Sequence, residues 1–224
     1  MRNPDPRRHL MVNSDTALVL TDPQNDFLSE HGVAWELVGQ SVQENGTIPN
    51  IERLLESATT AGVPVFVSPH YYYPYDGAWQ FGGTLEQKMH EIGMFARRGP
   101  LDLDGFEGSG ADWLDQYKPY LQGDGTVVTS PHKVYGPQNN DLALQLRKRG
   151  IGRVILAGMS ANLCVESHLR DLLERGFEVT VVADATAAAR HPELGDGYVA
   201  AMTNFRYLAS AVVDTVQASK ELAG

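Results

Sequence analysis

The chain has 224 residues, which is enough for one α/β domain with a sheet buried between two helical layers. Its 18 Lys and Arg residues against 28 Asp and Glu residues give a formal net charge of −10, which excludes nucleic acid and anionic membranes as favoured partners. A single cysteine excludes an internal disulfide and a site with several thiolate ligands, so we expect a cytoplasmic protein.

The first segment of the chain, residues 1–14, carries arginines but no apolar stretch of the kind that a secretory signal needs. We expect it to be an arm that is mobile or bound to a partner. The remaining residues, 15–224, are expected to form one domain, and none of their apolar runs approaches the roughly 20 residues of a membrane span.

Short apolar runs rich in β-branched residues predict six strands. The runs lie at 17–20, 63–67, 126–129, 154–156, 179–182 and, more weakly, 211–213. They are almost continuously apolar, which is typical of parallel strands that are covered on both faces.

Segments with apolar residues spaced by three and four predict helices between these strands. They lie at 51–61, 141–149, 162–175 and 197–208. Three of them are followed by a glycine that can end a helix in the left-handed conformation: Gly62, Gly150 and Gly176. The alternation predicts an α/β three-layer sandwich in which a six-stranded, mainly parallel, Rossmann-like sheet has helices on both faces.

One connection is much longer than the others. Residues 71–125 form an insertion rich in Tyr, Trp and Phe, within which 84–95 has a helical pattern. Insertions of this length are usually functional or have helices of their own. Two interpretations stay open: the aromatic rings pack into a small core of the insertion, or they form a lid and wall of a substrate pocket near the active site.

Polar residues follow four of the predicted strands, namely Asp22, His70, Lys133 and Cys164. The carboxyl ends of parallel strands meet at one edge of a sheet, where ligands bind in such folds. A thiol attacks as its thiolate, which a helix N-terminus and a nearby cation favour. Lys133 could be that cation if strand order follows sequence order here. Asp22 could take the thiol proton and later deliver it to a leaving nitrogen.

Each of these residues also has a purely structural interpretation. A lone cysteine near a strand end is often a small buried hydrophobe, an aspartate after a strand often shapes a turn, and a lysine in a loop is usually solvated. His70 and His132 are expected to be structural or to face the substrate, and not to bind metal.

Four segments together resemble the isochorismatase-like cysteine hydrolase superfamily. They are T-D-P-Q-N-D-F (21–27), S-P-H-K-V-Y-G (130–136), G-M-S-A-N-L-C-V-E-S (158–167) and V-A-D-A-T-A-A (182–188), and the resemblance extends from about residue 16 to 214. It implies a catalytic triad of Asp22, Lys133 and Cys164. It also implies a cis peptide bond between Met159 and Ser160, and an oxyanion hole formed by the backbone N–H groups of Ser160 and Cys164.

The sequence departs from relatives at two places. Ala161 stands where many relatives have Thr, so a hydroxyl is missing beside the cysteine. The nicotinamidase-like members have an Asp-x-His set and a second His for a metal, whereas this chain has only His70 in that region. We therefore expect no zinc or iron site and no cofactor.

The expected function is hydrolysis of a C–N bond in a small amide, ureide or carbamoyl compound through a thioester on the cysteine. Substrate contacts are expected from Gln24, Phe27, His70, Tyr72 and Trp79. The chain is expected to form a homo-oligomer, a dimer or a tetramer. Two alternatives are hydrolysis of a vinyl ether, in which the aspartate alone acts as acid, and a protein that binds a small molecule without catalysis.

Overall fold

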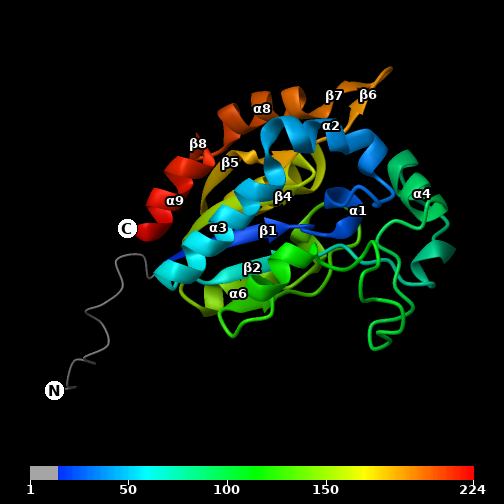
Figure 1. The fold of residues 1–224 in the computed structure, drawn as a ribbon, viewed down its shortest axis with the longest axis horizontal. Helices are drawn as coiled ribbons and strands as arrows, with labels where there is room; N and C mark the ends of the chain where they lie inside the picture. The colour runs from blue at the N-terminus through cyan, green and yellow to red at the C-terminus, as the bar shows by residue number, and fades with distance from the viewer. Residues whose placement is uncertain (1–14) are drawn as a thin grey trace.

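The computed structural model describes residues 15–224, which form a three-layer α/β sandwich around one sheet (Figure 1). The sheet has six strands, all parallel, in the order β3-β2-β1-β4-β5-β8. The strands are β1 (Thr16–Thr21), β2 (Val65–Ser68), β3 (Thr126–Val128), β4 (Arg153–Met159), β5 (Glu178–Ala187) and β8 (Ala211–Val213). The predicted fold class is confirmed. The predicted arm, residues 1–14, lies outside the described residues.

The strands do not follow the sequence order that would have placed Lys133 beside Cys164. Strand β1 lies between β2 and β4, and β3 is at the edge of the sheet. Leu18 of β1 is paired with Val65 on one side and with Ile155 on the other. Strands β2 and β3 extend the sheet on one side of β1, and β4, β5 and β8 extend it on the other side. The switch point therefore lies between β1 and β4, and ligand sites of open α/β sheets lie at such a point.

The helices confirm the predicted pattern and add to it. Their bounds are α1 (Asn25–Leu28), α2 (Trp35–Asn45), α3 (Thr47–Ala61), α4 (Thr84–Glu91), α5 (Lys118–Leu121), α6 (Leu142–Lys148), α7 (Glu166–Glu174), α8 (Gly197–Leu208) and α9 (Thr215–Ala223). Gly62, Gly150 and Gly176 have positive φ, as expected of helix-ending glycines. Helices α2 and α9 were missed because their apolar residues are few and interrupted by polar ones.

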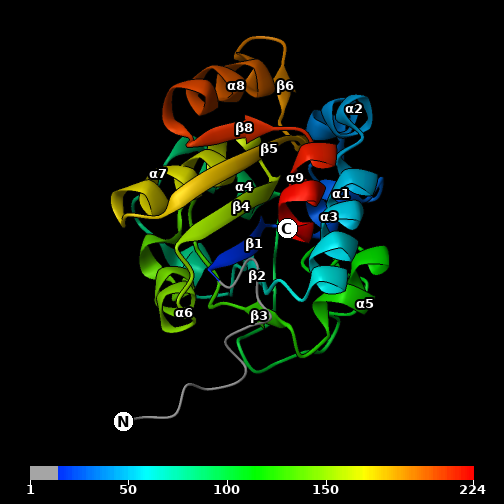
Figure 2. The same ribbon diagram turned by 90° about the vertical axis from the view of Figure 1, so that its left-hand side faces the viewer.

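Two apolar cores hold the helices on the sheet, one on each face. Helices α2, α3 and α9 pack on one face against residues such as Leu18, Leu20 and Ile155. Helices α6, α7 and α8 pack on the other face against alternate residues such as Val19 and Leu156 (Figure 2). Both faces of β1 are fully covered, which explains its continuously apolar sequence. Within residues 15–224, no helix is both long and apolar enough to cross a membrane.

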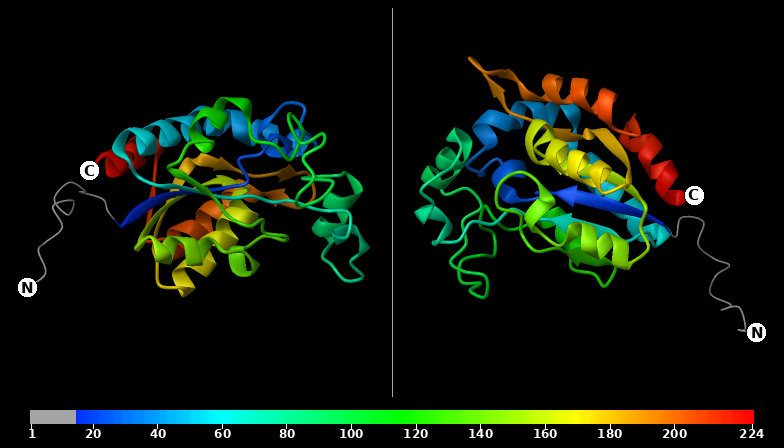
Figure 3. Two further views of the ribbon diagram at one scale, coloured as in Figure 1. Left: turned by 90° about the horizontal axis from the view of Figure 1, so that it is seen from below. Right: turned by 180° about the vertical axis from the view of Figure 1, so that it is seen from behind.

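The part of the insertion around α4 lies beyond the carboxyl ends of the strands, as both views of Figure 3 show, whereas α5 packs beside α3. The first rings of the insertion, Tyr71, Tyr72 and Tyr73, are buried, whereas Trp79 and Phe81 are 41% and 89% exposed. The insertion is tied to the domain by the buried carboxylate of Asp26, which accepts a hydrogen bond of 2.6 Å from the N–H of Phe95. Part of the aromatic cluster is therefore a local core.

Gly158 permits the close approach of β1 and β4 at the edge where the active site is expected. Its φ is 111°, a conformation that residues with a side chain rarely adopt. A Cβ atom built on Gly158 would collide with the backbone of Thr21. Thr21 can therefore contact the end of β4 only if position 158 is a glycine.

We predict that Gly158→Ala lowers the free energy of unfolding by about 2–4 kcal/mol, because it combines a steric collision with a strained backbone. The measurement is equilibrium unfolding in urea. The matched control is Gly152→Ala, since a Cβ there meets no atom within 4 Å, and it should change stability by less than about 0.5 kcal/mol. Equal stability of the two variants would contradict the argument.

Candidate active site

Asp22 stands directly after β1, at the switch point of the sheet. Its side chain is fully buried and its backbone has a φ of 46°, which is uncommon for a residue with a side chain. Its N–H donates to the carbonyl oxygen of Ser68 at 3.2 Å. The hydroxyl of Thr21 donates to the carbonyl oxygen of Met159 at 2.9 Å. The ends of β1, β2 and β4 are thus held together around the Asp22 carboxylate.

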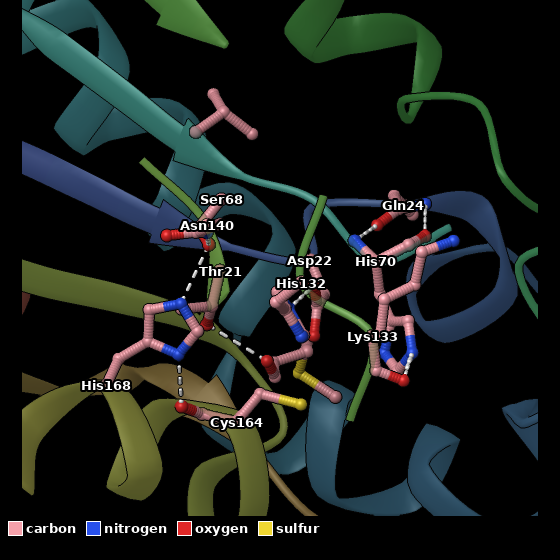
Figure 4. A network of polar contacts seen from close by, with 12 residues as sticks. Thr21, Asp22, Gln24, Ser68, His70, His132, Lys133, Asn140, Cys164 and His168 are labelled. Carbon is pink, nitrogen blue, oxygen red and sulfur yellow. Dashed lines mark hydrogen bonds and ion pairs between the residues drawn. The ribbon is translucent and has the colours of Figure 1, made fainter. Parts of the chain in front are cut away.

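Cys164 lies on the turn that follows β4. The residues Ala161–Val165 form one turn of π-helix that leads into α7, and the peptide bond between Met159 and Ser160 is cis. The Cys164 side chain is 3% exposed, and its sulfur points toward Asp22 and His132 (Figure 4). The backbone N–H groups of Ser160 and Cys164 are close enough to the sulfur to stabilise negative charge on it.

In the resting site Cys164 is favoured as the protonated thiol over the thiolate. Burial raises the pKa of the Cys164 thiol well above its usual value, and the neighbouring Asp22 carboxylate raises it further. The two backbone N–H groups act in the opposite direction and are weaker. A base must therefore remove the proton when the sulfur attacks, and a carboxylate oxygen of Asp22 lies within 4.8 Å of the sulfur.

His132 occupies the place beside Asp22 that was expected for Lys133. Its Nε2 lies 2.7 Å from Oδ1 of Asp22, and both side chains are fully buried. The N–H of His132 donates to the carbonyl oxygen of Pro69, and His132 pairs with His70 as an isolated parallel bridge. The chain after β3 therefore continues beside the chain after β2, which brings His132 to the switch point from the edge of the sheet.

The structure places Lys133 away from Asp22 and Cys164, contrary to the expected triad. Its Nζ donates to the carbonyl oxygen of Tyr71 at 2.8 Å and contacts Asp76 Oδ2 at 2.5 Å. It also lies 3.8 Å from the centre of the Tyr73 ring. Of these two adjacent residues, His132 faces Asp22, whereas Lys133 faces Tyr71 and Asp76. Lys133 instead stabilises the first residues of the insertion through its contacts with Tyr71 and Asp76.

Gln24 and His70 form a buried support behind the site. The backbone N–H of His70 donates to Gln24 Oε1, and Gln24 Nε2 donates to the carbonyl oxygens of His70 and Ala111, all at 2.9 Å. These bonds satisfy Gln24 within the protein, so the structure does not present it to a substrate. His70 Nε2 lies 3.0 Å from the carbonyl oxygen of Lys133, and burial lowers the pKa of His70 well below its usual value.

His168 is a buried histidine of the site that sequence reasoning missed. Its Nδ1 lies 2.7 Å from the carbonyl oxygen of Cys164 and its Nε2 lies 2.8 Å from the hydroxyl of Ser68. Burial lowers the pKa of His168 well below its usual value. Its spacing from Cys164 could have identified it in the sequence, because a residue four positions after Cys164 lies on the same helical face. His168 fixes the turn that carries the thiol.

An apolar pocket leads to Cys164. It has a volume of about 600 Å3 including its open mouth. Its walls come from α1, α2, α4 and the π-helical turn, and they include Phe27, Val38, Leu85, Met89, Ile92, Met94, Tyr135 and Leu163. Lys88, whose side chain is 63% exposed, is the charged residue of the wall.

The expected substrate contacts are distributed unevenly around this pocket. Phe27 is part of the pocket wall, whereas Tyr72 and Trp79 are not. The Tyr72 ring packs against His70, with ring centres 4.6 Å apart, and Trp79 packs on the outer side of Tyr72. The insertion does reach the pocket, but through the aliphatic and methionine side chains on and after α4.

Comparison with known proteins agrees with this architecture. Residues 16–217 match the Isochorismatase domain family. A ureidoacrylate amidohydrolase RutB from Pseudomonas savastanoi pv. phaseolicola is 32% identical over 190 residues, which cover 83% of this chain and 75% of that protein. The corresponding enzyme of Agrobacterium fabrum is 29% identical over 181 residues, with 77% and 76% covered.

Two solved structures have the same fold. A cysteine hydrolase from Pseudomonas syringae pv. phaseolicola superposes with a TM-score of 0.75 at 22% identity, covering 93% of this chain and 92% of that chain. The N-carbamoylsarcosine amidase of Thermoplasma acidophilum has a TM-score of 0.65 at 23% identity, with 90% and 96% covered. The chain belongs to the isochorismatase family. It is a hydrolase of the amidohydrolase type within that family.

Proposed function

We propose that this protein hydrolyses a C–N bond of a small amide, ureide or carbamoyl compound, with Cys164 as nucleophile and Asp22 as acid and base. The observation that carries the proposal is the buried Asp22 carboxylate, which contacts His132 at 2.7 Å and has an oxygen within 4.8 Å of the Cys164 sulfur, at the end of an apolar pocket. The names of the amidohydrolase relatives support the same reaction class.

In the first half of the proposed reaction, Asp22 takes the thiol proton while the sulfur forms a bond to the carbonyl carbon. The carbonyl oxygen becomes an oxyanion, which the N–H groups of Ser160 and Cys164 stabilise. When the C–N bond breaks, the leaving nitrogen takes the proton from Asp22. The products of this half are a free amine and a thioester on Cys164.

In the second half, water attacks the thioester while Asp22 accepts a proton from it. The C–S bond then breaks, the acid leaves, and the sulfur recovers its proton from Asp22. The protonation of the site is thus restored after each turnover. No cofactor takes part in the proposed reaction.

His132 is a positioning residue in this mechanism, because it acts through Asp22. Its Nε2–H donates to Oδ1 of the carboxylate. The other oxygen, Oδ2, has no hydrogen-bond partner among the described residues, which leaves it available for the proton that moves. One oxygen of Asp22 is thus held by His132 while the other can accept and release a proton, and both halves of the proposed reaction require this.

The pocket supports a substrate with an apolar group beside the scissile bond. Its wall is formed mainly by aliphatic, aromatic and methionine side chains, and its charged residue, Lys88, is largely exposed. Apolar walls favour apolar substrate groups, and a few polar groups fix the orientation. Ureides and carbamoyl compounds with a short hydrocarbon substituent fit this description.

The alternative reactions fit the site less well. Hydrolysis of a vinyl ether needs the aspartate but no thiol, whereas here the thiol lies between the aspartate and the pocket. A protein that only binds a ligand has no need for a buried carboxylate beside a buried thiol, which costs stability. The test is a screen of amides, ureides and carbamoyl compounds for release of amine or ammonia.

Two further expectations are kept as proposals. A homo-oligomer is supported by large apolar side chains exposed on the insertion and on α4, such as Phe81 and Leu85. A cytoplasmic location is supported by the lone Cys164, which has no cysteine to pair with.

Cys164→Ser is predicted to lower kcat/KM by at least about 10⁴-fold, because a serine hydroxyl is a far weaker nucleophile without a dedicated base of matching pKa. The substitution keeps the size of the side chain, so thermal unfolding should change little. Steady-state kinetics on a substrate found by the screen measures this. Activity within about tenfold of the wild type would refute the covalent mechanism.

Neighbouring variants separate the roles of His132 and Lys133. His132→Leu should lower kcat by at least about 10²-fold, since it leaves Asp22 without its partner, and His132→Gln should recover part of this loss by donating from its amide. Lys133→Met should keep kcat within about tenfold but lower stability by about 1–3 kcal/mol, because Asp76 loses its partner. The reverse pattern would restore the sequence-based assignment of Lys133.

Two methionine variants test the pocket. Met89→Ala removes a pocket wall, and Met202→Ala removes a similarly buried side chain from the core on the opposite face. Both should destabilise the protein by about 2–4 kcal/mol. Only Met89→Ala should raise KM for apolar substrates, by about tenfold or more. If both variants, assayed while folded, left KM unchanged, the pocket would not be the substrate site.

A further inference from the structure

We propose that Asp22, His70, His132 and Cys164 form a binding site for one thiophilic divalent ion such as Zn²⁺. The bound ion blocks hydrolysis. Each of the four offers one donor atom, and these atoms all lie within 4.8 Å of one another. The site goes beyond the proposed reaction and departs from the sequence-based expectation that His70 and His132 bind no metal. Its existence can be tested without turnover.

The four side chains are buried, and several of their polar atoms lack partners. Asp22, His70, His132 and Cys164 are each no more than 3% exposed. Among the described residues, Asp22 Oδ2, His70 Nδ1 and His132 Nδ1 have no hydrogen-bond partner. Buried polar atoms without partners are uncommon in folded proteins, because each costs free energy, and a bound ion is one way to satisfy them.

The hydrogen bonds around His70 leave its Nδ1 ready to bind an ion. The carbonyl oxygen of Lys133 can only accept, so His70 Nε2 carries the ring proton and Nδ1 has a free lone pair. A backbone carbonyl that accepts from the second ring nitrogen is the usual support of a metal-binding histidine. His168 differs, because both of its ring nitrogens already have partners in the protein.

The donor set selects the kind of ion. One sulfur, two imidazole nitrogens and one carboxylate oxygen are typical ligands of Zn²⁺ and Co²⁺, and do not suit Mg²⁺ or Ca²⁺. Bond lengths of about 2.0–2.3 Å in a tetrahedron place the donors about 3.3–3.8 Å apart, so the side chains need to close by about 1 Å. The thiolate and the carboxylate together neutralise the ion, which permits its burial.

Binding of the ion would remove the groups that the proposed reaction uses. The Cys164 sulfur loses its proton to solvent and forms a bond to the metal, so its electron pair is no longer available for a carbonyl carbon. An Asp22 oxygen bound to the metal cannot accept a proton. The pocket that leads to Cys164 gives the ion a route to the site.

The experiment titrates the metal-free wild-type protein with Co²⁺ and records absorption spectra. We expect one ion per chain, a charge-transfer band of a Co–thiolate bond, the visible bands of a four-coordinate ion, and displacement of both by Zn²⁺. The charge-transfer band should be absent in Cys164→Ser. In His70→Gln and His132→Gln the affinity should fall by at least about a hundredfold.

The control is His31→Gln, a histidine on the surface. Circular dichroism establishes that each variant folds. The control should bind Co²⁺ as the wild type does. Absence of a thiolate band in the wild type, or unchanged affinity in both site histidine variants, would overturn the site.

The inhibitory effect has a separate test in the hydrolysis assay. One equivalent of Zn²⁺ should abolish activity, and EDTA should restore it fully. If the protein with bound Zn²⁺ hydrolysed substrate at an undiminished rate, the ion would not block the nucleophile. Failure to find any substrate would leave the Co²⁺ result intact, so the two proposals fail independently.

Discussion

The buried hydrogen bond between Asp22 and His132 is the constraint on which the rest of the site depends. A carboxylate without exposure to water is costly unless protein groups replace its hydration. His132 supplies that partner from the chain after β3, although β3 lies two strands away from β1. Strand β2 lies between β1 and β3, so the chain that follows β2 runs beside the chain that follows β3, and His70 is paired with His132 there.

This arrangement explains why the thiol and the base lie together. The Asp22 carboxylate and the burial of the site both raise the pKa of the Cys164 thiol, so the sulfur stays protonated until a substrate arrives. In the proposed reaction the same carboxylate then serves as the base. A thiol held in this way is protected from unproductive reactions.

Much of the architecture could be predicted from the sequence because it depends on local patterns. Apolar runs located the six strands of the main sheet but not the short pair β6 (Arg190–His191) and β7 (Gly195–Asp196), and glycines located the ends of three helices. The edge at which Asp22 and Cys164 meet also followed from strand polarity. The order of the strands could not be predicted, since a sequence does not state which parallel strands are neighbours, and α2 and α9 lack clear periodicity.

The choice between His132 and Lys133 shows where sequence reasoning ends. The two residues are adjacent but their side chains face different partners, so an error of one position exchanges a site residue for one that supports the insertion. Lys133 was expected in the site because a cation next to a thiol favours the thiolate and because the family resemblance implies a lysine there. The structure shows its ammonium group bound to Asp76 and the Tyr71 carbonyl. Only tertiary contacts distinguish the two.

Mass spectrometry of the protein quenched in acid during turnover tests the central claim most directly. The account predicts that the peptide containing Cys164 gains the mass of the acyl part of the substrate, and that the gain disappears when the substrate is exhausted. Treatment of the quenched protein with hydroxylamine should release the adduct, as expected of a thioester. Sustained turnover with Cys164 unmodified at every quench time, from milliseconds to seconds, would contradict a covalent mechanism.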